Sequence, residues 1–428
     1  MSVAAATDRG ARLDHRARRP LVDVAAPAFL VLYVVVAFEP FELFFRPPGM
    51  VSSVGLPVIA VVILALTPSE RLARMPISLA LLAFLAWSAM SVGWSDSPSS
   101  TLFALRARHL PLLMVTLIAA TIPPRIVART LLGTAVVVTL WSLAVSLVLP
   151  MSRAVALEDG LDDQAGFRGT FGHKNFLGVF AVLALAAALP LLRSRRRRLV
   201  LVALILAALT TRSATTAGGL FALMFVWFWM RAIERGRTPR DRRLLLLVST
   251  SSALAGVLIA LRLLPVLLHV YDKDITFSGR TTIWSESLAA VAQRPWQGYG
   301  LAGVWTDPPT SLTLRLWSHI GFRAGHAHNG LVAVLLELGV VGAVLMAVFV
   351  VSVIRLAARA SREPELRRYG QWGLLFCASL LLMSLAEPLF ADHYLAYLAI
   401  LWTVLAGLLN EQRAARAGGR FRRPLTTF

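Results

Sequence analysis

Residues 323–330 read RAGHAHNG and lead directly into the apolar run LVAVLLELGVVGAVLMAVFVV at residues 331–351. Roughly 20 apolar residues in a helix cross a bilayer core of about 30 Å, so the sequence predicts a membrane span over 329–352. His326, His328 and Asn329 then lie at the mouth of that span, where a polar loop meets the membrane. Three polar, hydrogen-bonding side chains in that position are a candidate reaction centre.

Composition extends this prediction to the whole chain. The protein has 428 residues, of which 57% are hydrophobic and 15% charged, and a mean hydropathy of +0.69. This is too apolar for a soluble multidomain protein and predicts an all-α polytopic membrane protein. The single cysteine, Cys377, excludes a disulfide framework and a zinc–thiolate site.

About twelve segments are long and apolar enough to be transmembrane helices. They are 24–45, 51–67, 76–93, 104–121, 127–149, 175–192, 198–211, 215–232, 244–267, 329–352, 371–386 and 392–409. Residues 198–232 are divided at Arg212, because one span there would be too long and would carry this arginine at its centre.

Arginine placement predicts that both termini are cytoplasmic. With that orientation, the inner connections and tails hold 30 of the 43 basic residues and 9 of the 23 acidic residues. The excess of basic residues is therefore positive-inside bias, and the net charge of +20 does not indicate nucleic-acid binding. Runs such as 195–198 are interpreted as topology anchors near anionic lipid.

The domain prediction has three parts. Residues 1–23 and 410–428 are expected to be cytoplasmic tails, the first of them disordered, and 24–409 form one transmembrane domain. Two outer loops are long, 150–174 and 269–328, and loops of such length are usually functional. The second is expected to contain a helix near 281–293.

Four arginines on the predicted outer face are candidates for anion binding: Arg106, Arg108, Arg212 and Arg280. A guanidinium group forms two parallel hydrogen bonds to phosphate oxygens, so arginines that converge with a histidine suit a pyrophosphate. For Arg106 and Arg108 the alternative is that they reach out to lipid headgroups.

Acidic residues give weaker signals. Asp272 and Asp274 have the spacing of a metal-binding pair, but such pairs are common, and no metal site is predicted. Glu387 follows a span and either faces the outer cavity or belongs to a plain interfacial turn. Glu337 lies inside the 329–352 span and is a functional candidate because intramembrane carboxylates are costly.

Gly339 and Ala343 in the same span are four residues apart. Small residues at that spacing let two helices approach closely, so the pair predicts a helix-packing face.

Three stretches together resemble the O-antigen ligase and polymerase superfamily, which includes exopolysaccharide polymerases. The first is FRGTFGHKNFLG at 167–178, and the second is SGRTTIW at 278–284 followed by PWQGYG at 295–300. The third is His328-Asn329, nine residues, and then GVVG at 339–342. The resemblance covers roughly residues 24–409.

The resemblance implies a GT-C-like enzyme that transfers a glycan from an undecaprenyl-pyrophosphate carrier to an acceptor hydroxyl, without a cofactor or metal. Carried over by motif, His328, Arg280 and Arg212 are the expected catalytic residues. Arg212 fits the family pattern only loosely. His326 has no motif support and is expected to be a neighbour. The expected substrate-binding residues are Arg106, Arg108, Arg168, His173, Lys174, Asn175 and Asn329.

The HKN run at 173–175 favours a polysaccharide polymerase over a ligase that moves finished glycan to a lipid or protein. A lipid-linked glycan transporter is a third reading, disfavoured because the halves of the chain are not repeats of each other. The expected location is the bacterial cytoplasmic (inner) membrane, with the active site on its outer face. Expected partners are the lipid-linked glycan, membrane lipid and polysaccharide-export machinery, and no nucleic acid.

Overall fold

The computed structural model describes residues 3–42, 44, 49–149, 166–235, 279–390 and 394–417, together with 238, 240–241, 243–252, 254 and 262. Within these residues the regular structure is helical, and seven helices are long and apolar enough to cross a membrane. Two shorter apolar helical stretches, Val51–Leu66 and Leu79–Trp94, accompany them. The prediction of an all-α polytopic membrane protein is confirmed.

The helices follow one another in a simple order. They are α1 (Val3–Ala37), η1 (Val51–Gly55), α2 (Leu56–Leu66), α3 (Ser69–Leu72), α4 (Leu79–Met90), η2 (Ser91–Trp94), α5 (Pro98–Ala104), η3 (Leu105–His109), α6 (Leu110–Thr121), α7 (Pro124–Val148), α8 (Lys174–Leu191), α9 (Arg197–Thr210), α10 (Ala214–Arg235), α12 (Arg280–Gln293), α13 (Ser311–Ile320), α14 (Gly330–Arg362), α15 (Arg367–Met383) and α16 (Tyr394–Ala417).

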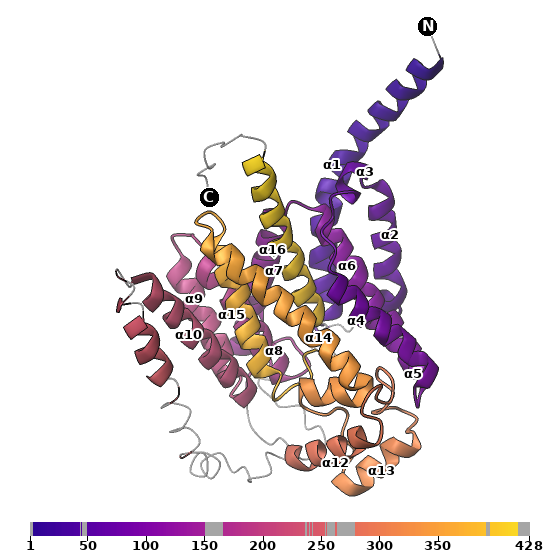
Figure 1. Cartoon of the computed structure of the whole chain (residues 1–428), viewed down its shortest axis with the longest axis vertical. Helices are drawn as coiled ribbons and strands as arrows, with labels where there is room; N and C mark the ends of the chain where they lie inside the picture. The colour runs from indigo at the N-terminus through magenta and orange to yellow at the C-terminus, as the bar shows by residue number, and fades with distance from the viewer. Residues whose placement is uncertain are drawn as a thin grey trace.

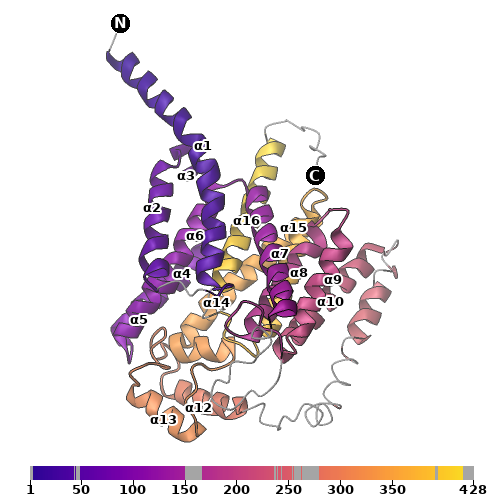
Figure 2. The same ribbon diagram turned by 180° about the vertical axis from the view of Figure 1, so that it is seen from behind.

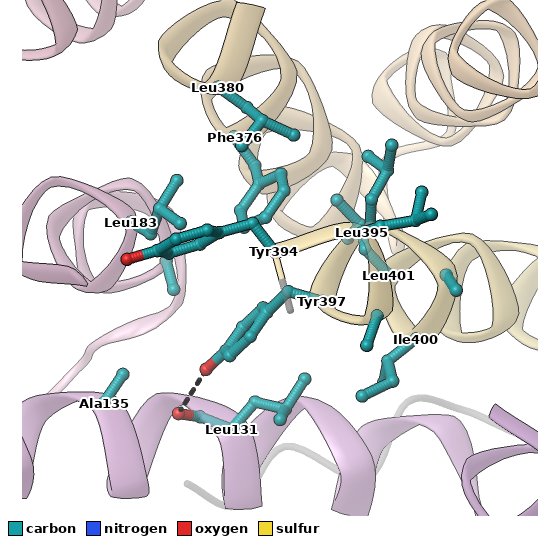
Figure 3. Packing of buried hydrophobic residues seen from close by; sticks show 14 of the residues in the cluster. Leu131, Ala135, Leu183, Phe376, Leu380, Tyr394, Leu395, Tyr397, Ile400 and Leu401 are labelled. Carbon is teal, nitrogen blue, oxygen red and sulfur yellow. Dashed lines mark hydrogen bonds between the residues drawn. The ribbon is translucent and has the colours of Figure 1, made fainter. Parts of the chain in front are cut away.

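Helices α8 and α16 form the centre of the bundle, since 83% and 78% of the residues in their most apolar stretches are buried. Figure 3 shows how the core joins them to α7 and α15. Tyr397 of α16 stacks on Phe376 of α15 at 5.8 Å and donates a hydrogen bond to the carbonyl of Leu131 of α7 at 3.4 Å. Leu183 of α8 belongs to the same buried cluster. Burying such side chains against each other replaces contact with lipid by close packing.

The two chain ends lie at one end of the bundle, and α12 and α13 lie at the other, in both views (Figures 1 and 2). The loop that carries α12 and α13 therefore covers the face of the bundle opposite the termini. This face also holds the start of α14, where the loop returns to the bundle.

Most predicted boundaries are close to the observed ones. The division of 198–232 is confirmed, because α9 ends at Thr210, α10 begins at Ala214, and Arg212 has a φ of 50° that no helix continues through. The loop helix predicted at 281–293 is α12, but α13 was not predicted. The predicted span at 244–267 lies mostly outside the described residues.

At the N-terminus, α1 begins at Val3, inside the predicted tail at 1–23, and its leader is rich in alanine and arginine, which favour helix. The prediction that the first span reaches residue 45 is wrong, because α1 ends at Ala37. Glu39 has a φ of 44° and Pro40 follows it, and neither conformation continues a helix.

Gly339 interrupts α14 with φ 66° and ψ −169°, so its predicted role in a helix-packing face is wrong. Residues 295–300 of the long loop pack against this break and hydrogen-bond to the backbone on both sides of it. The amides of Gly300 and Val340 donate to the carbonyls of Glu337 and Pro295, at 2.8 Å in both cases. The side chain of Glu337 is also used here, because its Oε2 accepts the amide of Ala302 at 3.0 Å. Glu337 thus anchors the loop to the span.

We expect Gly339→Ala to destabilise the protein by at least about 2 kcal/mol, because only glycine adopts this backbone conformation without strain. A Cβ at Gly339 would also lie 2.3 Å from the carbonyl oxygen of Trp296. Thermal unfolding of the purified protein measures the loss. Gly133→Ala in α7 is the matched control, since its Cβ would have no neighbour within 4 Å. Equal melting temperatures for the two variants would contradict the role of the break.

Candidate active site

Asn329 caps α14 and thereby fixes the position of the histidine segment, residues 326–328. Its Oδ1 accepts the amides of Leu331 at 3.0 Å and Val332 at 3.1 Å, and its Nδ2 donates to the carbonyl of Leu385 at 3.1 Å. An asparagine in this position satisfies amides that the helix itself leaves without partners. Asn329 was predicted to bind substrate, and the structure places its side chain in this cap.

His328 precedes the cap and is held in a left-handed conformation with φ 48°. Its amide donates to Nδ1 of His326 at 3.2 Å, and the two imidazole rings lie 3.9 Å apart. The preceding carbonyl, of Ala327, accepts the indole N–H of Trp284 at 2.9 Å. Helix α12 therefore helps to position the segment, and His326 is a direct partner of His328.

Partial burial keeps the His328 imidazole neutral. The loss of hydration, together with the neighbouring His326, Arg280 and His173, lowers its pKa from 6.5 to about 2. Its Nδ1 is buried and has no hydrogen-bond partner among the described residues. The ring therefore has an unused hydrogen-bonding atom in a cationic environment.

Arg280 reaches this group from the first turn of α12. Its Nη1 donates to the carbonyl of Ala386 at 3.0 Å, and its Nη2 lies 3.5 Å from Oε1 of Glu387. The charge on Arg280 is one of those that act on His328. The two residues are 48 positions apart in the sequence, and the long loop brings them together as predicted.

The start of α8 contributes a third side to the site. His173 caps α8, because its Nδ1 accepts the amide of Asn175 at 3.1 Å. Asn175 Nδ2 donates to Oε1 of Glu387 at 2.7 Å, while Lys174 is buried. Arg168 lies just before this turn, and its Nη1 donates to the carbonyl of Gly172 at 3.3 Å.

Residues 199–347 match the family model described as O-antigen ligase, and this range includes Arg212, Arg280 and His328. Residues 199–347 belong to the O-antigen ligase family. The chain is also similar to exopolysaccharide production protein ExoQ of Rhizobium meliloti (strain 1021), with 29% identity over 354 residues that cover 78% of each chain. The family carries out glycan transfer of the O-antigen ligase or polymerase type.

Glu387 joins the parts of the site, and sequence reasoning missed this role. Glu387 is only 6% exposed, and its carboxylate contacts Asn175 from α8 and Arg280 from α12. The sequence leaves a plain interfacial turn open as an alternative, because the distant partners cannot be read from the local sequence. The only local signal was a carboxylate directly after an apolar span.

His326, His328 and Glu387 could in principle hold a metal ion, since their ligand atoms lie within 4.8 Å of one another. Their surroundings fit an anion better. Arg280 lies 3.5 Å from the Glu387 carboxylate and places positive charge near His328. This charge would repel a second cation and attract a phosphate.

Three predicted residues lie on other elements. Arg212 is exposed in the turn between α9 and α10, and this turn contacts the segment that leads to His173, since the amide of Phe167 donates to the carbonyl of Thr210 at 2.9 Å. Arg106 and Arg108 are exposed on η3. The guanidinium of Arg106 lies over the Phe103 ring at 5.9 Å.

Proposed function

We propose that this protein transfers a glycan from an undecaprenyl-pyrophosphate-linked oligosaccharide to an acceptor hydroxyl and thereby polymerises an exopolysaccharide or O-antigen type polymer. The observation that carries this proposal is the meeting of Arg280 with a neutral, half-buried His328, where α12 and α14 begin. A cationic group and a proton acceptor at one point are what such a transfer requires.

We further propose twelve spans, with both termini in the cytoplasm of a bacterium and the site on the outer face of its cytoplasmic membrane. The predicted inner connections hold most of the arginines. The shared end of the two termini supports the same orientation (Figures 1 and 2). The finished polymer would then emerge on the side where polysaccharide-export machinery can receive it.

The reaction breaks the bond between the anomeric carbon and the pyrophosphate oxygen and forms a bond to the acceptor oxygen. A lipid pyrophosphate is already a good leaving group, so the protein must stabilise the departing negative charge and position the acceptor. Arg280 binds the pyrophosphate oxygens in this proposal, with Arg212 as a second cation. The substrate is held by His173, Lys174, Asn175 and Arg168, and Arg106 and Arg108 contact its outer part.

His328 accepts the proton of the acceptor hydroxyl. With a pKa of about 2 in the free protein it is a weak base. A bound pyrophosphate would favour the imidazolium form and so raise this pKa toward the range of a useful base. The substrate therefore activates its own proton acceptor.

This coupling predicts a difference between two pH profiles. The profile of kcat/KM reports the free protein and that of kcat reports the complex with substrate. The acid limb of kcat should lie at higher pH than that of kcat/KM, because the anion raises the pKa of His328. Initial rates between about pH 5 and pH 8 should show the acid limb in kcat, while kcat/KM stays flat because a pKa of about 2 lies below this range. A kcat/KM limb near pH 6.5 that persists in His326→Asn would contradict the low pKa of His328 in the free protein.

A ligase is the second candidate, favoured by the description of the matching family model. The name of the relative from Rhizobium meliloti favours exopolysaccharide production instead. Deleting the gene in its host and sizing the glycans on gels separates the candidates. A polymerase mutant accumulates single repeats on the carrier, a ligase mutant accumulates long chains on the carrier, and a transporter mutant keeps its repeats on the inner face. Only the first result supports the proposal.

A further inference from the structure

We infer that Glu387 is the resting counter-ion of Arg280, and that the pyrophosphate displaces it when the substrate binds. Glu387 is then a positioning residue that sets how tightly the site holds its anion. This inference rests on the proposed function and identifies the event that makes Arg280 available to the carrier.

The geometry shows that Arg280 is held loosely. Its Nη2 lies 3.5 Å from Oε1 of Glu387, whereas a charge-assisted hydrogen bond is typically about 2.7–2.9 Å long. The same oxygen accepts Nδ2 of Asn175 at 2.7 Å, so Asn175 provides the shorter contact. When Arg280 exchanges Glu387 for the pyrophosphate, Glu387 keeps its hydrogen bond from Asn175 of α8. The exchange therefore does not leave the buried carboxylate without a hydrogen bond.

Exposure shows which of the two residues a ligand can reach. The side chain of Arg280 is 23% exposed and that of Glu387 is 9% exposed. Because Nη1 of Arg280 also holds the carbonyl of Ala386, the guanidinium stays at the edge of the site. A pyrophosphate that arrives from solvent meets the arginine first. It offers several oxygens to a guanidinium that its present carboxylate contacts only at 3.5 Å.

Charge explains why a counter-ion belongs here. Arg280 places positive charge near His328, and the Glu387 carboxylate contacts this arginine. Without the carboxylate, this positive charge would hold any anion more tightly, including the lipid pyrophosphate released after transfer. Glu387 therefore weakens anion binding in the free site and allows the product to leave.

The test measures binding of inorganic pyrophosphate to the purified full-length protein in lipid nanodiscs, by calorimetry. Glu387→Gln keeps an acceptor for Asn175 and removes the charge. We expect it to bind pyrophosphate about fivefold more tightly than the unchanged protein, the range of a partly exposed ion pair. In the transfer assay it should lower KM and kcat together. Glu387→Asp restores the charge and should return the affinity to within about twofold.

Glu286→Gln is the matched control, because Glu286 lies on the same α12 and pairs with His319 at 2.8 Å on the exposed side. It should leave pyrophosphate affinity unchanged. A purely structural role for Glu387 would weaken binding in both Glu387→Gln and Glu387→Asp and would overturn the inference. The inference would also be overturned if the unchanged protein bound no pyrophosphate. It would be overturned as well if binding needed an added divalent cation that the Glu387 variants no longer retain.

The binding measurement also separates this inference from the proposed function. Polymer formation with unchanged affinity in Glu387→Gln would overturn the inference alone. Tighter pyrophosphate binding in Glu387→Gln, in a protein that forms no polymer or ligated product, would overturn the function while keeping the anion site.

Discussion

Arg280→Ala is expected to lower kcat for glycan transfer by about 10²–10³-fold, the usual cost of removing one preorganised group that stabilises developing charge. The guanidinium lies at the meeting point of α12, α8 and the histidine segment, and its replacement leaves the departing pyrophosphate without this cation. Arg280→Lys keeps a charge but loses the paired hydrogen bonds, so an intermediate loss of about tenfold is expected. Rates of pyrophosphate-carrier release by the purified protein measure both.

Arg315→Ala is the control for Arg280→Ala. Arg315 lies exposed on α13, in the same loop, and its Nη2 contacts Oε1 of Gln293 at 3.3 Å. Its removal should change kcat by less than about twofold, since an exposed polar contact contributes little. If Arg280→Ala and Arg315→Ala had equal rates, the role of Arg280 as the pyrophosphate ligand would be refuted.

His328→Ala is expected to reduce kcat by about 10²–10⁴-fold, the range of a general base. His328→Gln separates the two roles that an imidazole can have here. A glutamine can donate a hydrogen bond to a phosphate but cannot accept the proton of the acceptor hydroxyl. We expect His328→Gln to be as inactive as His328→Ala, as judged by polymer length and by carrier release.

The control for His328 is His319→Ala, on α13, whose side chain is 55% exposed and pairs with Glu286. It should retain full activity. Activity of His328→Gln within about tenfold of the unchanged protein would show that His328 only holds the phosphate, and the general-base role would be abandoned.

The sequence predicts much of the fold because the membrane imposes simple rules on it. Each predicted apolar segment outside 244–267 coincides with a helix, since a lipid-facing backbone must satisfy its own hydrogen bonds. The break at Arg212 could be predicted from the cost of an arginine at mid-membrane. The helix at 281–293 could be predicted because its apolar residues share one side and Pro295 ends it.

Parts of the site that depend on tertiary contacts could not be predicted. Glu387 meets Asn175 and Arg280 across 212 and 107 positions, and nothing near it in the sequence indicates either partner. His326 has no motif support, yet it accepts the amide of His328. Gly339 has the spacing of a helix-packing glycine. The break at this residue depends on the loop at 295–300 that packs against α14, which the local sequence does not indicate.

The proposed extension of a glycan on a pyrophosphate lipid is tested most directly by incubating the purified protein in nanodiscs with undecaprenyl-pyrophosphate-linked repeat units and sizing the products. We predict a ladder of lengthening glycans with release of one carrier pyrophosphate for each repeat added, absent in Arg280→Ala and His328→Ala. Repeat units that stay single, with no carrier pyrophosphate released by the unchanged protein, would contradict the claim.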